Sequence, residues 1–130
     1  MIWSLRRWTE AARLRQPVEP ILYASHHACG AEDGAEHFDE LMCLLAVSAH
    51  RKIVVRCGCF KTAHPDEMAL LSILRWVQAD QWDLAEEKLK TMITGKLVRP
   101  FLRTAATYVH HLNGAQLRLA PTASLKVISR

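Results

Sequence analysis

Four stretches of this chain carry apolar residues at the spacing of an α-helix. In residues 36–50 the apolar positions follow the first by three, four, seven and eleven residues, a period near 3.6 rather than the period of about 2 that a strand gives. Similar stripes run through 65–79, 81–93 and 100–112. Helices with one apolar face must bury it, so we predict an all-α fold, a compact bundle of these four core helices. The predicted stripes are Phe38, Leu41, Met42, Leu45 and Ala49; Leu70, Leu71, Leu74, Val77 and Gln78; Trp82, Ala85, Leu89, Met92 and Ile93; and Phe101, Leu102, Ala105, Val109 and Leu112.

Residues that favour helix termini mark where these helices begin. Pro65 suits a first helical position, and the acidic pair that follows it favours the positive end of the helix dipole. Thr62 or His64 can cap this helix, and threonine is the better acceptor of the two. Asp80 is predicted to cap the next helix, and Pro100 to start the fourth.

The first sixteen residues predict a further helix, basic and amphipathic. Its apolar stripe includes Trp8, while Arg6 and Arg7 are predicted to point away from that stripe. Such a helix can dock onto the body of the protein or onto a partner chain, or it can lie on an anionic membrane surface. The pairing of Trp3 with Trp8 favours an interaction role, so Trp3, Trp8, Arg6 and Arg7 are the candidate interaction residues, with a protein partner or a second copy of the chain as the ligand.

The remaining segments are predicted to be loop and tail. Pro17 and Pro20 end the basic helix, and the small and polar residues that follow favour a loop. Near the other end, alternating leucines predict a short extended C-terminal segment. We therefore predict one domain over 1–130, made of a basic helix at 1–16, a loop at 17–35, a helical core at 36–120 and a tail at 121–130.

Length and composition exclude several classes of protein. Half of the 130 residues are hydrophobic, enough for one buried core. The longest apolar run, residues 41–47, is far shorter than the roughly 20 residues that cross a bilayer. The first residues lack the apolar run of a secretory signal, so a cytoplasmic location with reduced thiols is expected.

Cysteine and histidine spacing raises the possibility of zinc. Cys57 and Cys59 could form one pair of ligands, and His26 and Cys29 the other, with His64 in reserve. The spacing is unusual, because one intervening residue in an extended chain sends alternate side chains to opposite sides. We keep a zinc-stabilised binding module as an alternative; the first hypothesis has no cofactor.

A redox role for the same pair is a weaker interpretation. Arg56 and Lys61 flank Cys57 and Cys59, and positive charge lowers the pKa of a cysteine. The usual redox dithiol, however, has two intervening residues and follows a strand of an α/β sheet. Cys43, within an apolar part of its helix, is expected to be a small buried residue.

Charge is segregated along the chain, whose formal net charge is +4. Residues 17–50 contain six acids and no lysine or arginine, whereas 96–130 contain six basic residues and no acid. The basic termini allow nucleic-acid binding as a second alternative. No serine or acid is spaced to complete a nucleophilic arrangement with the histidines, so the chain is not predicted to be an enzyme. The first hypothesis is a small helical interaction or regulatory protein that acts through protein–protein contacts, with dimerisation one of its forms.

Overall fold

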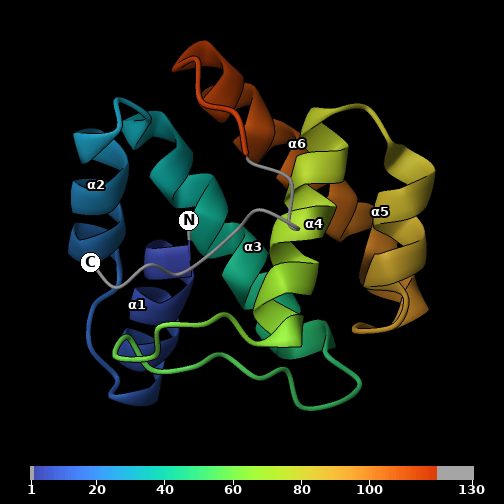
Figure 1. Ribbon diagram of the computed structural model, residues 1–130, viewed down its shortest axis with the longest axis horizontal. Helices are drawn as coiled ribbons and strands as arrows, with labels where there is room; N and C mark the ends of the chain where they lie inside the picture. Colours follow the sequence, from blue (N-terminus) through green and yellow to red (C-terminus); the bar gives the residue numbers. More distant parts are fainter. Residues whose placement is uncertain (1, 120–130) are drawn as a thin grey trace.

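The chain folds into helices packed around one shared core. The computed structural model describes residues 2–119, and this part contains six α-helices, two short 3-10 helices and no strand. The predicted all-α fold is therefore confirmed (Figure 1). In chain order the elements are α1 (Ile2–Arg13), α2 (Glu19–Ala28), η1 (Glu32–Gly34), α3 (Ala35–Ser48), α4 (Pro65–Gln78), α5 (Trp82–Leu89), η2 (Gly95–Leu97) and α6 (Val98–Gly114).

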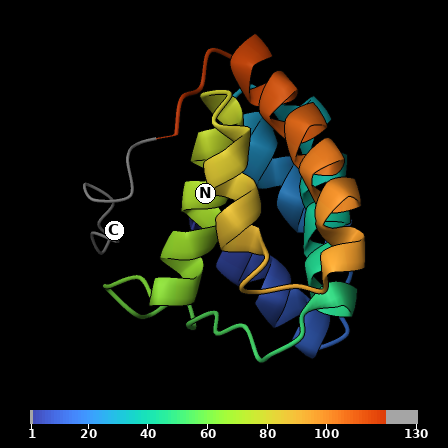
Figure 2. The ribbon, with the colours of Figure 1, turned by 90° about the vertical axis from the view of Figure 1, so that its right-hand side faces the viewer.

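Helices α3, α4, α5 and α6 form the bundle. Helix α3 packs against α2 and α6, and α4 packs against α5 and α6. Figure 2 shows α5 and α6 side by side on one face, with α1 and α2 on the far side. The most deeply buried apolar residues of this core are Ile73, Ala85, Leu89, Met92, Ile93, Ala105 and Tyr108.

The four core helices stand where the apolar period predicted them, apart from small shifts at their ends. The largest difference is in the third, α5, which ends at Leu89 although Met92 and Ile93 are buried as expected. Here the chain leaves the helix and pairs with the end of α3. The amide of Thr94 donates to the carbonyl of Ser48 at 2.8 Å, and Ala49 and Ile93 form an isolated antiparallel β-bridge. A tertiary contact thus ends α5 before its stripe runs out.

The prediction of a loop over 17–35 is wrong, because α2 and η1 lie within it. Pro20 occupies the first turn of α2, where its missing amide hydrogen costs nothing. Leu22 and His26 lie one helical turn apart and are buried on the same face of α2. Pro20 therefore lies at the start of a helix, and not at the start of a loop.

One of the two candidate caps for α4 is confirmed, and the predicted cap of α5 is wrong. His64, and not the better acceptor Thr62, caps α4: its Nδ1 accepts from the amide of Asp66 at 3.0 Å, and Glu67 Oε1 accepts from the amide of His64 at 2.8 Å. This reciprocal pair is a capping box with histidine in the place of serine or threonine. Asp80 makes no cap for α5 and turns the chain with a φ of 60°, in the left-handed region.

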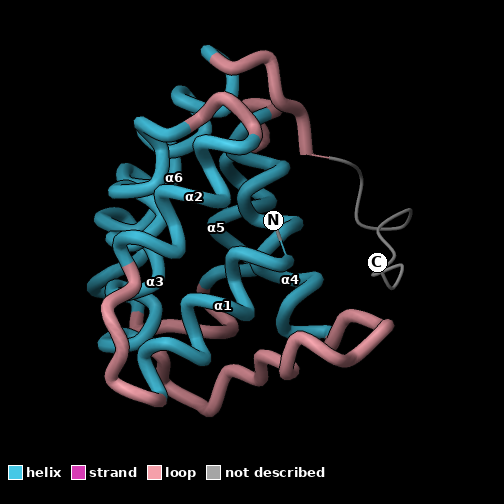
Figure 3. The backbone as a smooth tube through the Cα atoms, turned by 90° about the vertical axis from the view of Figure 1, so that its left-hand side faces the viewer, coloured by secondary structure: helices cyan, strands magenta, loops and turns pink. Residues whose placement is uncertain are grey.

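A long loop, residues 49–64, joins α3 to α4 and runs past one end of α1 (Figures 1 and 3). It forms no named strand. At the other end of the molecule, residues 115–119 run along α4, where Gln78 Nε2 donates to the carbonyl of Leu117 at 2.7 Å and Gln78 Oε1 accepts from the amide of Leu119 at 2.8 Å. The predicted tail, 121–130, lies outside the described residues. Over 2–119, the helices are all too short or too polar to cross a membrane.

Candidate functional site

A buried ion pair joins α1 to α4. Arg6 Nε donates to Glu67 Oε2 at 2.8 Å and Arg6 Nη2 donates to Glu67 Oε1 at 3.0 Å, so the guanidinium binds both carboxylate oxygens. The two side chains are 3% and 0% exposed. The predicted outward orientation of Arg6 is therefore wrong. A charge this deeply buried is tolerated because its partner and hydrogen bonds replace water.

The ion pair also holds the 49–64 loop. Arg6 Nη1 donates to the carbonyl of Phe60 at 2.8 Å, and Nη2 donates to the carbonyl of Thr62 at 3.0 Å. From the other side, Glu67 Oε2 accepts from the backbone amide of Arg56 at 3.1 Å. The residues that flank Cys57 and Cys59, Arg56 before them and Phe60 after them, are thus each bonded to one member of the pair.

The electrostatics of Glu67 follow from these bonds. Burial alone would raise the pKa of its carboxyl, but the Arg6 guanidinium and the amides of His64 and Arg56 outweigh burial and hold that pKa below its ordinary value. The hydrogen bond with Glu67 also raises the pKa of Arg6, despite the opposing effect of burial. Both groups are therefore charged at neutral pH.

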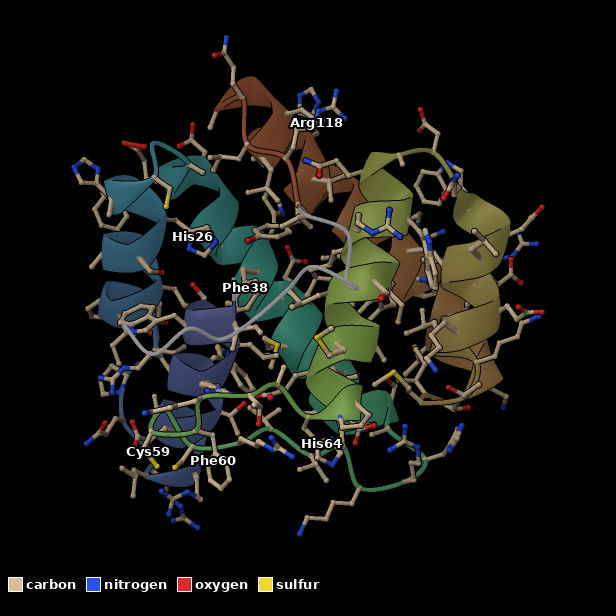
Figure 4. All side chains as sticks on the ribbon, in the orientation of Figure 1. His26, Phe38, Cys59, Phe60, His64 and Arg118 are labelled. Carbon is tan, nitrogen blue, oxygen red and sulfur yellow. The ribbon has the colours of Figure 1, made fainter. Side chains whose placement is uncertain are left out.

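The two thiols lie on a tight turn. The amide of Phe60 donates to the carbonyl of Cys57 at 3.2 Å, which closes a turn over Cys57, Gly58, Cys59 and Phe60. The chain is therefore not extended here, and the concern that one intervening residue would separate the sulfurs does not apply. Instead the two cysteines share one turn, and both side chains are exposed. Figure 4 shows Cys59 and Phe60 beside the end of α1.

The turn makes the two thiols unequal. The neighbouring Cys59 thiol lowers the pKa of Cys57, and the backbone amides of Cys59 and Phe60 and the charge of Arg6 act in the same direction. The Cys57 side chain and burial raise the pKa of Cys59. Cys57 is therefore the thiol of the pair that loses its proton more readily.

Cys43 shows the contrasting case. It is exposed, not buried as predicted, and lies on α3 at the edge of a surface groove of about 500 Å³ between α3 and α6. Partial burial, together with the charges of Asp39 and Glu40, raises the pKa of its thiol. Exposure alone therefore does not favour a thiolate in this protein; the surrounding charge and hydrogen bonds decide it.

The structure does not bring the four predicted zinc ligands together. Cys57 and Cys59 share their turn, but Figure 4 places His26 well away from Cys59, near the opposite end of α2. Residues 2–119 contain no group of three or more histidine, cysteine or acidic side chains arranged to hold a metal ion. The charge of Arg6 acts on both sulfurs.

His26 has a different role, in the core. Its Nδ1 is 2.9 Å from the carbonyl of Leu22, which can only accept, so Nδ1 carries the hydrogen and Nε2 accepts from the hydroxyl of Tyr108 at 2.9 Å. Phe38 packs against both rings (Figure 4). Burial lowers the pKa of His26 and raises that of Tyr108, so this pair is neutral and structural.

The remaining candidate interaction residues divide into docked and exposed. Trp8 is half-buried and its indole Nε1 donates to Asp39 of α3 at 2.7 Å, which fastens α1 to the body. Trp3 is 55% exposed, and the Arg7 guanidinium lies 5.7 Å from its ring centre. Of the predicted face, Trp3 is therefore the exposed side chain, while Arg7 is partly exposed and paired with Glu10 at 2.9 Å.

The role of Glu67 was missed from sequence, where it was read only as a helix-initiating acid. One signal pointed further: Glu67 stands three positions after His64, the capping-box spacing, which draws a carboxylate back over the start of its helix. No comparable local signal identifies Arg6, because its partner lies 61 positions away.

Comparisons with protein-family models, with curated proteins and with solved structures gave no match. The site is therefore interpreted from its own geometry.

Proposed function

We propose that this protein is a small redox-responsive regulatory protein whose working group is the Cys57–Cys59 dithiol. The observation that carries the proposal is the turn itself, closed by the Phe60 amide on the Cys57 carbonyl, which holds two exposed thiols where the charge of Arg6 acts on both. This deepens the regulatory role expected from sequence and adds a chemical group on which regulation can act. An exposed thiolate with a neighbouring thiol is the arrangement that reacts with disulfides.

The reaction is a thiol–disulfide exchange with a small disulfide, RSSR. The Cys57 thiolate attacks one sulfur of RSSR, forming a mixed disulfide and releasing RS⁻, which takes up a proton. Cys59 then loses its proton to solvent and attacks the sulfur of Cys57, releasing the second RS⁻. Two electrons pass from the protein to RSSR, which ends as two RSH, and Cys57 and Cys59 end as a disulfide.

The charge around the turn favours an anionic disulfide. Residues 41–65 contain no acid, and Arg51, Lys52, Arg56 and Lys61 all lie in this stretch. Of the two acids that follow this stretch, Glu67 is buried and neutralised by Arg6, and Asp66 is paired with Arg51. An anionic substrate such as oxidised glutathione is therefore attracted to the loop, and salt screens the attraction.

The experiment uses a parent variant in which the other two cysteines, both exposed, are removed: Cys29→Ser with Cys43→Ser. The reduced parent is incubated with oxidised glutathione, quenched with N-ethylmaleimide and weighed by mass spectrometry. We expect an intramolecular disulfide, lighter than the dithiol by two hydrogen atoms. Adding Cys59→Ser should stop the reaction at a glutathione adduct on Cys57, because no second thiol is present to displace it.

Two controls test the contribution of the fold. When salt is added, the rate of reaction with a neutral disulfide, bis(2-hydroxyethyl) disulfide, should fall less than the rate with oxidised glutathione. A short unstructured peptide with the same Cys-Gly-Cys should react more slowly than the protein at pH 7, because it lacks Arg6 and the fixed turn. Equal rates for peptide and protein would overturn the proposal.

A second candidate function is self-association through α1, favoured by the exposure of Trp3. The exposed face of α1 carries Trp3 and Arg7. Helix α3 carries exposed Glu36 and Glu40 within the acidic 17–50 stretch, so a second copy offers the complementary charge.

Sedimentation equilibrium across a range of protein concentrations tests this candidate. The wild type should gain mass with concentration and lose it with salt, whereas Trp3→Ser combined with Arg7→Gln should stay monomeric. A monomeric wild type at every concentration would count against it. The zinc module and nucleic-acid binding remain predictions; Arg118, from the basic C-terminal third, lies at the opposite end of the molecule from Cys59 (Figure 4).

A further inference from the structure

The Cys57–Cys59 turn and the docking of α1 depend on the same set of bonds. Arg6, from α1, donates to the carbonyl of Phe60, the residue directly after Cys59. Glu67, its partner on α4, accepts from the amide of Arg56, the residue directly before Cys57. The ion pair that fixes α1 therefore holds the backbone on both sides of the dithiol.

Oxidation changes this turn in two ways. A disulfide fixes its two sulfurs at about 2.05 Å, so closing one across the Cys57–Phe60 turn constrains the backbone that carries the Phe60 carbonyl, which Arg6 bonds. Oxidation also removes the two ionisable thiols whose charge acts on Arg6. Both changes bear on Arg6 in one step.

Helix α1 has few other contacts that could replace the interactions of Arg6. Its other ties to the body include the buried Leu5 and Ala11, the packing of Trp8 with its hydrogen bond of 2.7 Å to Asp39, and a hydrogen bond of 3.2 Å between Ser4 and Ser25. A buried guanidinium that loses acceptors must find water, and water reaches it only if α1 moves.

We propose that the dithiol is a redox-controlled latch on α1: the reduced turn holds the helix through Arg6, and formation of the Cys57–Cys59 disulfide loosens it. This inference rests on the proposed function, because it needs the same disulfide to form. It adds a structural consequence: oxidation of the two exposed thiols controls the packing of α1. A loosened α1 uncovers the side chains beneath Leu5, among them Phe38, Leu41 and Leu70.

Hydrogen–deuterium exchange read by mass spectrometry tests the latch. The Cys29→Ser, Cys43→Ser parent is compared as dithiol and as disulfide after treatment with oxidised glutathione. Peptides from α1 should exchange about tenfold faster in the disulfide form, the factor that corresponds to losing one hydrogen bond to a charged group. Peptides from α5 and α6, which the latch does not touch, should be unchanged.

The matched control is treated with the same oxidant but lacks both reactive thiols. Adding Cys57→Ser and Cys59→Ser to the parent should make exchange in α1 insensitive to oxidised glutathione. If the disulfide forms and α1 exchanges at its original rate or more slowly, the latch is wrong while the dithiol function stands. If no disulfide forms, both fall together.

Discussion

Arg6 of α1 and Glu67 of α4 form a two-bond ion pair across 61 positions of sequence, with both side chains almost fully buried. Removing one member leaves the other charged and buried without its partner. We expect Glu67→Gln to cost about 3–5 kcal/mol of unfolding free energy, measured by urea denaturation.

An exposed ion pair supplies the control for that measurement. Glu86 and Lys90 pair at 3.1 Å on the surface of α5, where water screens the interaction. Glu86→Gln should cost less than about 0.5 kcal/mol. A Glu67→Gln variant no less stable than Glu86→Gln would contradict the role given to the buried pair.

The hydrogen bond from Trp8 to Asp39 should be separable from the packing of the indole ring. Trp8→Phe keeps an aromatic ring but removes the donor that now lies 2.7 Å from Asp39 Oδ1. We expect a loss of about 1–3 kcal/mol by thermal or urea unfolding. Trp3→Phe, at an exposed site, should change stability by less than about 0.5 kcal/mol. Similar losses in both variants would show that the hydrogen bond is not what matters.

Stability should fall on the acid side of neutrality because of His26. Burial depresses the pKa of His26 in the folded state, so the unfolded chain binds a proton more readily. This contribution to stability is complete above the ordinary histidine pKa of about 6.5 and is lost as the pH falls below it. Urea unfolding at a series of pH values measures the effect.

His26→Gln should flatten the dependence near pH 6, because glutamine does not titrate. A second loss, below about pH 4.3, should remain in that variant, since it comes from carboxylates such as Glu67 whose pKa is lowered by folding. An unchanged slope near pH 6 in His26→Gln would assign the effect to other groups.

Cys57 should be a more reactive thiol than Cys43. Its lowered pKa predicts alkylation by iodoacetamide at pH 7 faster than that of Cys43, whose pKa is raised. Cys59→Ser removes the neighbouring thiol that lowers the pKa of Cys57 and should change the pH at which alkylation of Cys57 is half-maximal. Peptide mapping after brief labelling gives the rates at each site. Faster labelling of Cys43 than of Cys57 would contradict the electrostatic account of the turn.

Chelation separates the dithiol from the zinc module predicted from sequence. His26, one of the predicted ligands, is engaged by Tyr108 and Leu22. Reduced protein treated with EDTA should keep its helical circular dichroism and its thermal midpoint. Stoichiometric zinc in protein purified without added metal, lost in Cys57→Ser with Cys59→Ser, would restore the zinc interpretation.

Local patterns predicted the helices of the bundle because each carries its own apolar stripe. They failed at α2, where proline and small polar residues imitate a loop and only Leu22 and His26 mark the buried face. They failed again at Arg6, because a helical pattern assigns every arginine to the solvent face. What reverses that assignment is a carboxylate from another helix, and periodicity within one segment contains no information about it.

The candidate site was likewise predicted only in part from sequence. Sequence singled out Cys57 and Cys59 but judged their spacing from extended backbone, whereas the chain turns there. The turn depends on Arg56 and Phe60 being anchored to Glu67 and Arg6, which is a property of the assembled fold.

The separation of Arg6 from Glu67 also bears on how the chain is made. During synthesis α1 leaves the ribosome long before the residue that neutralises its buried guanidinium, and a helix with an unpaired internal charge has no stable place to pack. Helix α1 is therefore expected to be among the last of these helices to settle, and until then its arginine remains hydrated and accessible to chaperones.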